Sequence, residues 1–146
     1  ADFLRDSITT TPGLVKTQKG ETIGAHDGVE LFTIGQRHGI GVAGGGAPLY
    51  VAEKDIHSAT LVVAAEGEDS PLYKNEVQFH SANWIAAMDV GRPFRCEARI
   101  RYRAPLARCT IYGDRVLFDE PQRAIAPGQS IVFYDGDTVL GGAVIE

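Results

Sequence analysis

The chain has 146 residues, of which 44% are hydrophobic, and a formal net charge of −5 at pH 7. This length is enough to bury a hydrophobic core, as one domain or as two small ones. The sequence has no run of 18 apolar residues and no charged-then-apolar leader, so we expect a cytoplasmic protein with neither a membrane span nor a secretory signal.

The charge is unevenly distributed along the chain. Residues 1–76 carry six Lys and Arg against eleven Asp and Glu, whereas residues 77–146 carry eight cations against eight anions. All eight cations of the second part are Arg, whose planar fork of donors matches phosphate and stacks on bases. This pattern is consistent with a recognition surface, although a general compositional preference for Arg explains the same count about equally well.

Turn-forming residues separate short apolar segments in the first part of the chain. Leu14, Val15 and Ile23 predict two strands joined by a turn at 19–21. Two further strands are predicted at 49–54 and 60–64, joined by the polar segment "DIHS". The charged, proline-bearing segment "EGEDSPLYKN" then favours a boundary near Glu76, which gives a β-rich domain over 1–76 and a second domain over 77–146.

A glycine-rich segment, "LFTIGQRHGIGVAGG" at 31–45, interrupts these strands. Its glycines permit positive φ angles and a close approach to a partner, and Gln36, Arg37 and His38 would project from it. A long surface hairpin with incidental polar residues and a contact surface are about equally consistent with this composition.

The segment "FRCEARIRYRA" at 94–104 alternates strictly between two faces of a strand. The predicted inward residues are Cys96, Ala98, Ile100 and Tyr102. The predicted outward residues are Arg95, Glu97, Arg99, Arg101 and Arg103. One face is therefore expected to be core and the other basic.

Two hairpins follow, around Gly113-Asp114 and around 135–137, both with residues typical of tight turns. Short strands at this spacing predict an antiparallel barrel or sandwich, and barrel closure would remove exposed edges. No helix longer than about two turns is expected, and the segment "SANWIAAMDVG" from Ser81 is compatible with either a short helix or a strand.

Signals for catalysis are sparse. The sequence contains no GxxxxGK[ST] loop and no GxGxxG after a strand, and its four histidines lack metal-ligand spacing. Cys96 and Cys109 have no CxxC spacing and fall on inward strand positions, where burial disfavours a thiolate. We therefore expect two buried thiols, no catalytic residue and no metal site in this chain.

An ordered set of motifs resembles one family. The segment "HDGVELFTIGQRHGIGV" is similar to the HDG-x-x-x-(Tyr/Phe)-TIGQR-(Lys/His)-G-(Leu/Ile)-G signature of the tRNA-specific 2-thiouridylases, and "PLYVAEKD", "RYR", "FDEP", "APGQSIVFYDGD" and "LGGAVIE" continue the resemblance in the same order. His38 stands where Lys is common in the family. The resemblance covers nearly the whole chain.

The resemblance implies a mainly β fold, with a small central domain followed by a C-terminal antiparallel β-barrel similar to domain 2 of elongation factor Tu. In the whole enzyme it implies a tRNA-modifying sulfurtransferase, in which ATP with Mg²⁺ activates C2 of the wobble uridine and a cysteine persulfide supplies sulfur. The ATP loop and both catalytic cysteines lie upstream of the matching region. This portion is therefore expected to be non-catalytic and to hold no cofactor.

The resemblance also implies partners and contact residues. The partners are the tRNA anticodon arm, the N-terminal catalytic domain of the same enzyme and a sulfur-relay donor protein. The tRNA-contacting residues carried over are Arg101, Tyr102 and Gln129. Arg101 falls on the predicted outer face, but Tyr102 falls on the inner one, which suggests a bulge or a strand end that turns its ring outward. Further candidates for tRNA or interdomain contact are Gln36, Arg37, His38, Arg99 and Arg103.

Two other functions remain open from the sequence. One is a freestanding RNA-binding or interaction barrel without catalysis, and the other is an unrelated small enzyme that uses Cys or His chemistry. The tRNA-binding portion of a thiouridylase is the function that the ordered motifs favour.

Overall fold

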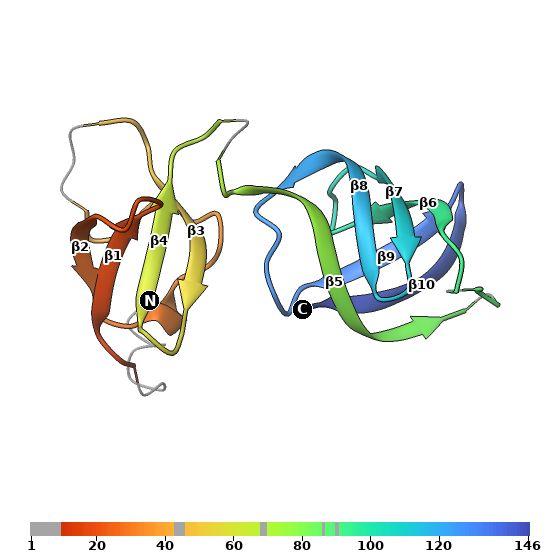
Figure 1. Cartoon of the computed structure of the whole chain (residues 1–146), viewed down its shortest axis with the longest axis horizontal. Coiled ribbons are helices and arrows are strands. Elements are labelled where there is room, and N and C mark those ends of the chain that lie inside the picture. The colour runs from red at the N-terminus through yellow and green to blue at the C-terminus, as the bar shows by residue number, and fades with distance from the viewer. Residues whose placement is uncertain (1–9, 43–45, 68–69, 86, 90) are drawn as a thin grey trace. The chain divides into compact units, whose positions relative to one another are not determined.

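The computed structural model describes residues 10–42, 46–67, 70–85, 87–89 and 91–146. The chain divides into two compact units between Tyr73 and Lys74, close to the boundary predicted near Glu76 (Figure 1). The described residues contain no α-helix, only a single 3-10 turn, η1 (Val29–Leu31). None of their helical segments is long and apolar enough to cross a membrane.

The first unit is a four-stranded sheet. Its strands are β1 (Gly13–Thr17), β2 (Thr22–His26), β3 (Tyr50–Asp55) and β4 (Thr60–Ala64). The order is β2-β1-β4-β3, with β1 and β4 parallel and the other pairs antiparallel. The strands and the turn at 19–21 are confirmed, and Gly20 supplies the positive φ of 84° that this turn requires.

One face of this sheet carries the core of the unit. Val15, Leu61 and Val63 are almost completely buried, whereas Leu14, on the other face of β1, is 44% exposed. Phe32 and Ile40, from the segment after η1, cover the same core. Each fully buried side chain of this size contributes about 1.5–3 kcal/mol, so the glycine-rich segment is held partly by its own apolar residues.

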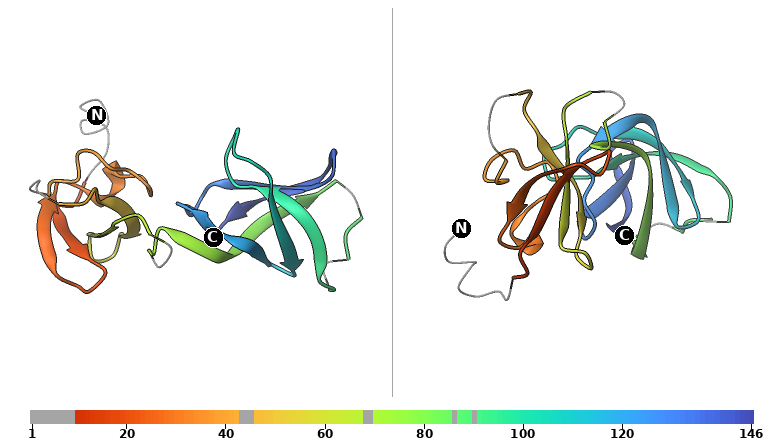
Figure 2. Two further views of the ribbon diagram at one scale, coloured as in Figure 1. Left: turned by 90° about the horizontal axis from the view of Figure 1, so that it is seen from above. Right: turned by 60° about the vertical axis from the view of Figure 1, so that its left-hand side comes forward.

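The second unit is a closed antiparallel barrel with the strand order β10-β5-β8-β7-β6-β9, and Figure 2 shows it from two further sides. Its strands are β5 (Tyr73–Trp84), β6 (Phe94–Arg99), β7 (Ala107–Tyr112), β8 (Arg115–Arg123), β9 (Ser130–Asp135) and β10 (Thr138–Ile145). Both predicted hairpins are present, and closure leaves the barrel without a free edge.

An aromatic cluster fills part of the barrel. The ring of Phe133 lies 5.6 Å from that of Phe79 and 5.3 Å from that of Trp84, between ring centroids. Trp84 belongs to β5, so the segment that begins at Ser81 starts as a strand rather than a helix. Ser81 itself has a positive φ of 54°, which interrupts the regular alternation of β5.

Candidate nucleic-acid interface

The arginine-rich strand ends earlier than its alternation predicts. β6 stops at Arg99, and residues 101–104 form a turn in which the amide of Ala104 donates to the carbonyl of Arg101 at 3.0 Å. Tyr102, predicted to face the core, is instead 88% exposed. The inward position predicted from alternation was wrong, whereas the strand end that would turn this ring outward is present, because alternation no longer applies once the chain leaves the ladder.

The side chain of Arg101 is anchored. Its Nη2 donates to the backbone carbonyl of Arg123 at 2.7 Å, which links the turn after β6 to the end of β8. A guanidinium has five N–H donors, so this bond leaves donors available to a ligand. Arg101 is exposed, and its anchoring limits the conformational freedom that it would lose on binding.

Gln129 stabilises the turn that precedes β9. Its side-chain Oε1 accepts from the amide of Ala126 at 3.3 Å, and its backbone carbonyl accepts from the amide of Ile145 at 2.8 Å. Arg99 pairs with Val132 in the antiparallel β6–β9 ladder, so Gln129 and the turn after β6 lie at the same end of this strand pair. The structure therefore gives Gln129 a structural role close to Arg101 and Tyr102.

The other outward arginines of β6 do not form a uniform basic face. Arg95 makes a bidentate pair with Asp119, at 2.6 and 2.8 Å, and also donates to Thr110. This ion pair lowers the pKa of the Asp119 carboxyl, chiefly because Arg95 donates hydrogen bonds to it. The guanidinium of Arg99 lies over the ring of Tyr134 at 5.4 Å, and its Nε is buried without a hydrogen-bond partner among the described residues.

The glycine-rich segment of the first unit is ordered by its own glutamine. Gln36 accepts from the amide of Thr33 at 3.1 Å and donates to the carbonyl of His38 at 2.9 Å. Its backbone carbonyl also accepts from the amide of Val51, at 2.9 Å. Gln36 therefore braces the loop, while Arg37 and His38 are exposed. Residues 43–45 of this segment lie outside the described residues.

A groove of about 910 Å³ lies beside Arg37 and His38, with Ile40, Val42 and Leu49 among its apolar lining. Its shape depends on Gly41, which has a φ of 80° and at which a Cβ would come 2.4 Å from the carbonyl oxygen of Ala25. The glycine is thus required for the close approach of the loop to β2.

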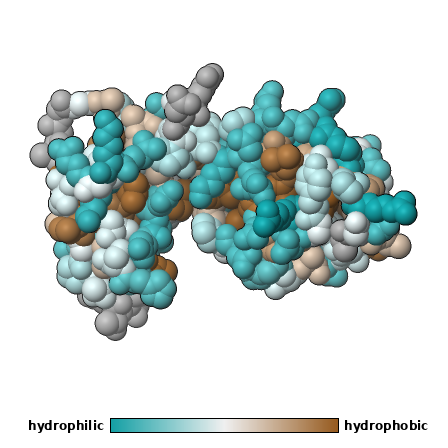
Figure 3. Space-filling model, viewed as in Figure 1, coloured by the Kyte–Doolittle hydropathy of each residue, from teal (hydrophilic) through white to brown (hydrophobic). Residues whose placement is uncertain are grey.

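The face shown in Figure 3 is mostly hydrophilic on each unit.

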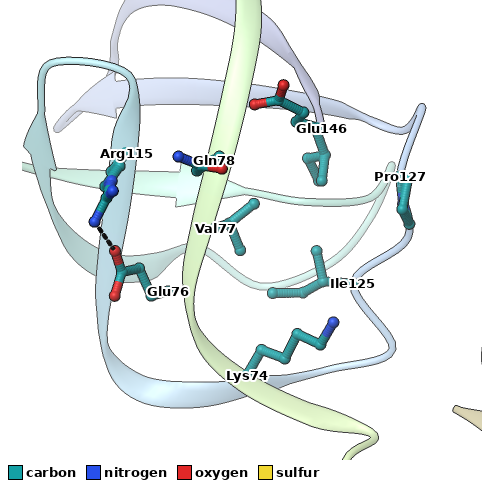
Figure 4. A pocket seen from close by; sticks show the side chains of 9 residues that line it. Lys74, Glu76, Val77, Gln78, Arg115, Ile125, Pro127 and Glu146 are labelled. Carbon is teal, nitrogen blue, oxygen red and sulfur yellow. Dashed lines mark hydrogen bonds and ion pairs between the residues drawn. The ribbon is translucent and has the colours of Figure 1, made fainter. Parts of the chain in front are cut away.

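The barrel also carries a smaller pocket, of about 410 Å³, around Val77 and Ile125 (Figure 4). Arg115, at its edge, pairs with Glu76 at 3.1 Å. Lys74 and Glu146 also line this pocket, so its charges are balanced. A balanced set of charges gives little net attraction to phosphate.

The two cysteines lie opposite each other on β6 and β7, with 3.7 Å between their sulfurs, and both are free and buried as expected. The hydrogen bond to Cys96 and burial raise the pKa of the Cys109 thiol, which opposes nucleophilic chemistry there. Among the described residues, no three His, Cys, Asp or Glu side chains gather as metal ligands.

Several features of this interface could not be read from strand alternation. The signal that was missed is the sequence "RYRAP" at 101–105, in which Pro105 follows a four-residue turn. Tyr134 and the carbonyl of Arg123, which hold Arg99 and Arg101, come from strands distant in sequence. Of the predicted contact residues, Gln36, Arg37 and His38 lie in the first unit and all the others lie in the barrel, so each unit carries its own set.

Two family models match the chain in succession. Residues 1–65 match the tRNA methyl transferase PRC-barrel domain, and residues 74–145 match the aminomethyltransferase beta-barrel domain. The order and extent of these matches correspond to the sheet unit and the barrel.

Curated relatives match across both units. The tRNA-specific 2-thiouridylase MnmA of Pseudomonas fluorescens (strain Pf0-1) is 43% identical over 154 residues, which covers 100% of this chain and 41% of that protein. The tRNA-specific 2-thiouridylase MnmA 2 of Geobacillus kaustophilus (strain HTA426) is 42% identical over 150 residues, which covers 99% of this chain and 40% of that protein. The MnmA of Hahella chejuensis (strain KCTC 2396) is 44% identical over 154 residues. The chain spans about two fifths of the length of these relatives. With both units matched in order and across their whole length, the chain belongs to the tRNA-specific 2-thiouridylase family, as its central and C-terminal β domains.

Proposed function

We propose that this chain is the tRNA-binding portion of an ATP-dependent tRNA 2-thiouridylase, which thiolates C2 of the wobble uridine. The relatives are named as tRNA-specific 2-thiouridylases, and the resemblance of the motifs points the same way. The observation that carries the binding role is the exposed turn at 101–104, where an anchored Arg101 lies beside an almost fully exposed Tyr102.

This turn suits the recognition of an unpaired RNA segment. Proteins read single-stranded RNA by stacking its bases on aromatic side chains and Arg planes, while cations contact the phosphates. An enzyme that modifies a base must also extract it, at a cost of about a few kcal/mol. The barrel would hold the anticodon arm during that step, in the cytoplasm.

The thiolation reaction itself is expected to take place on a domain outside this chain. Both thiols are buried, and the described residues contain no group of three His, Cys, Asp or Glu side chains that could hold a metal ion. Activation of the uridine and delivery of sulfur therefore involve the catalytic domain of the same enzyme and its sulfur-donor protein. The exposed Arg37 and His38 are candidates for contact with that domain or with tRNA.

A binding titration tests the proposal. The 146-residue chain is titrated with tRNA that carries a wobble uridine, at about 50 and 200 mM salt, where phosphate contacts have their largest effect. We expect salt-sensitive binding, and we expect Arg101→Ala to weaken it and to reduce the salt slope by about one.

Arg92→Ala is the matched control. Arg92 is also an exposed arginine of the barrel, but it precedes β6 and so lies at the opposite end of that strand. Equal binding by both variants would remove the turn from the interface. The absence of binding at both salt concentrations would refute the tRNA-binding role of this portion.

A further inference from the structure

The turn at 101–104 has an unfavourable residue at its third position. Its first central residue, Tyr102, has a negative φ, and its second, Arg103, has a φ of 65°. With the hydrogen bond between Arg101 and Ala104, this is the pattern of a type II turn. Type II turns strongly favour Gly or Asn at this position, because a side chain there is strained.

The size of the side chain sets Arg103 apart. The other positive-φ residues that are not glycine, among those described, are Ala59, Ser81 and Ala124, which are all small. Arg103 is large and exposed, and no hydrophobic burial offsets its strain. Residues held in such backbone conformations gather at ligand-binding sites, where the side chain has a use that glycine cannot supply.

The contact that Arg103 makes indicates this use. Its guanidinium lies over the ring of Tyr102, 5.5 Å from the centroid, while Tyr102 remains 88% exposed. An exposed cation–π contact is comparable in strength to the strain at Arg103, so the stack adds little net stability. The guanidinium lies on one side of the ring, and the ring is otherwise open to solvent. A contact of this kind favours one orientation of the ring over others.

We propose that Arg103 is a positioning residue, which holds Tyr102 so that the open face of the ring receives an unpaired base of the bound RNA. This inference rests on the proposed tRNA-binding function and specifies its ligand contact. Bases stack readily on aromatic rings whatever their sequence, and an oriented ring loses less conformational freedom on binding than a mobile one. The anchored Arg101 on the same turn is then available to a neighbouring phosphate.

Three substitutions separate this role from a purely structural one. Arg103→Gly and Arg103→Asn both suit a positive φ, so each is expected to fold with a melting temperature equal to or above that of the unmodified chain. Arg103→Lys keeps the charge but loses the planar group that stacks on the ring. The Gly variant also loosens the backbone, and the Asn variant controls for this effect.

The experiment measures both the stacking of an RNA base on Tyr102 and the affinity of the chain for the RNA. An anticodon stem-loop RNA carries 2-aminopurine at each loop position in turn, and its fluorescence falls when the base stacks on an aromatic ring. With the unmodified chain we expect quenching at one loop position. With Arg103→Gly and Arg103→Asn we expect that quenching to be lost and affinity to fall about five- to tenfold, as for the loss of part of one base stack.

The remaining comparisons distinguish the possible failures. Arg103→Lys should retain the salt slope yet lose the quenching, and Tyr102→Ala should match Arg103→Asn. If the unmodified chain binds and all three Arg103 variants bind and quench equally, the positioning role is wrong while the tRNA-binding function stands. If the unmodified chain does not bind the RNA at all, the tRNA-binding function fails, and the positioning role fails with it.

Discussion

Truncation of Phe133 to alanine tests the packing that positions the binding turn. Phe133 lies on β9, is completely buried, and contacts both Phe79 and Trp84. Phe→Ala substitutions at buried sites cost about 3–5 kcal/mol. At roughly 0.05–0.15 kcal/mol per residue, a unit that spans residues 74–146 is expected to be stable by only about 4–11 kcal/mol. Phe133→Ala should therefore remove between about a quarter and all of the stability of the barrel.

The assay uses a natural reporter. The sequence has one tryptophan, and Trp84 lies in the barrel against Phe133, so its fluorescence follows unfolding of the barrel in urea. Val139→Ala on the adjacent β10, where the side chain is 40% exposed, is the matched control and should cost less than about 0.5 kcal/mol. A loss below about 1 kcal/mol for Phe133→Ala would refute the close packing of this core.

Three further predictions concern other parts of the chain. Asp119→Asn should lower the melting temperature at pH 7, and the difference in melting temperature between the two chains should shrink below about pH 4. The pKa of Asp119 is lowered in the folded state, so its stabilising contribution is present above the ordinary pKa and is lost as the pH falls. An unchanged difference at pH 2 would contradict this. Gly13→Ala should destabilise the first unit by about 1–3 kcal/mol, measured by circular dichroism. The added Cβ would lie 1.7 Å from the carbonyl oxygen of Ala59, which hydrogen-bonds with buried His26. Gly46→Ala is the control and should not destabilise the unit, because a Cβ at Gly46 meets open space. Ellman's reagent should leave both thiols unmodified in the native chain and react with both in urea, since both are buried; fast reaction in the native state would contradict their burial.

The proposed interface uses few of the arginines near β6, because these arginines differ in whether they already have a partner. Of the five arginines between 92 and 103, Arg95 is committed to Asp119 and Arg99 to Tyr134, whereas Arg101 and Arg103 are both exposed on one turn. The count of arginines therefore overstated the basic surface, and the arrangement of the turn matters more. Recognition by one aromatic ring and two nearby guanidinium groups requires no large positive patch, which is compatible with the net charge of −5.

The residues alone predicted the strands of the first unit, the arginine-rich strand β6, the two tight hairpins and the burial of both thiols. They left a barrel and a sandwich open, and only the family resemblance favoured the barrel. The long strand β5 was not predicted, since the segment from Ser81 was compatible with a helix or a strand. The features that were predicted are local: period-two alternation decides which side chains face inward, and Gly and Asp residues determine where a hairpin turns. The ordered motifs likewise predicted the family, because they persist in order along the chain.

Only the tertiary structure decided what the polar side chains do. Tyr102 turned outward because β6 ends at Arg99, where its ladder with β9 stops. The partners of Arg95, Arg99 and Arg101 come from β7, β8 and β9, and strand register and barrel closure bring them together. Gln36 and Gln129, both predicted contact residues, also hydrogen-bond to backbone groups in their own turns, which their sequence did not indicate. Such pairings depend on neighbours that are distant in sequence, which is why alternation could predict the faces of the strands but not the arrangement of this interface.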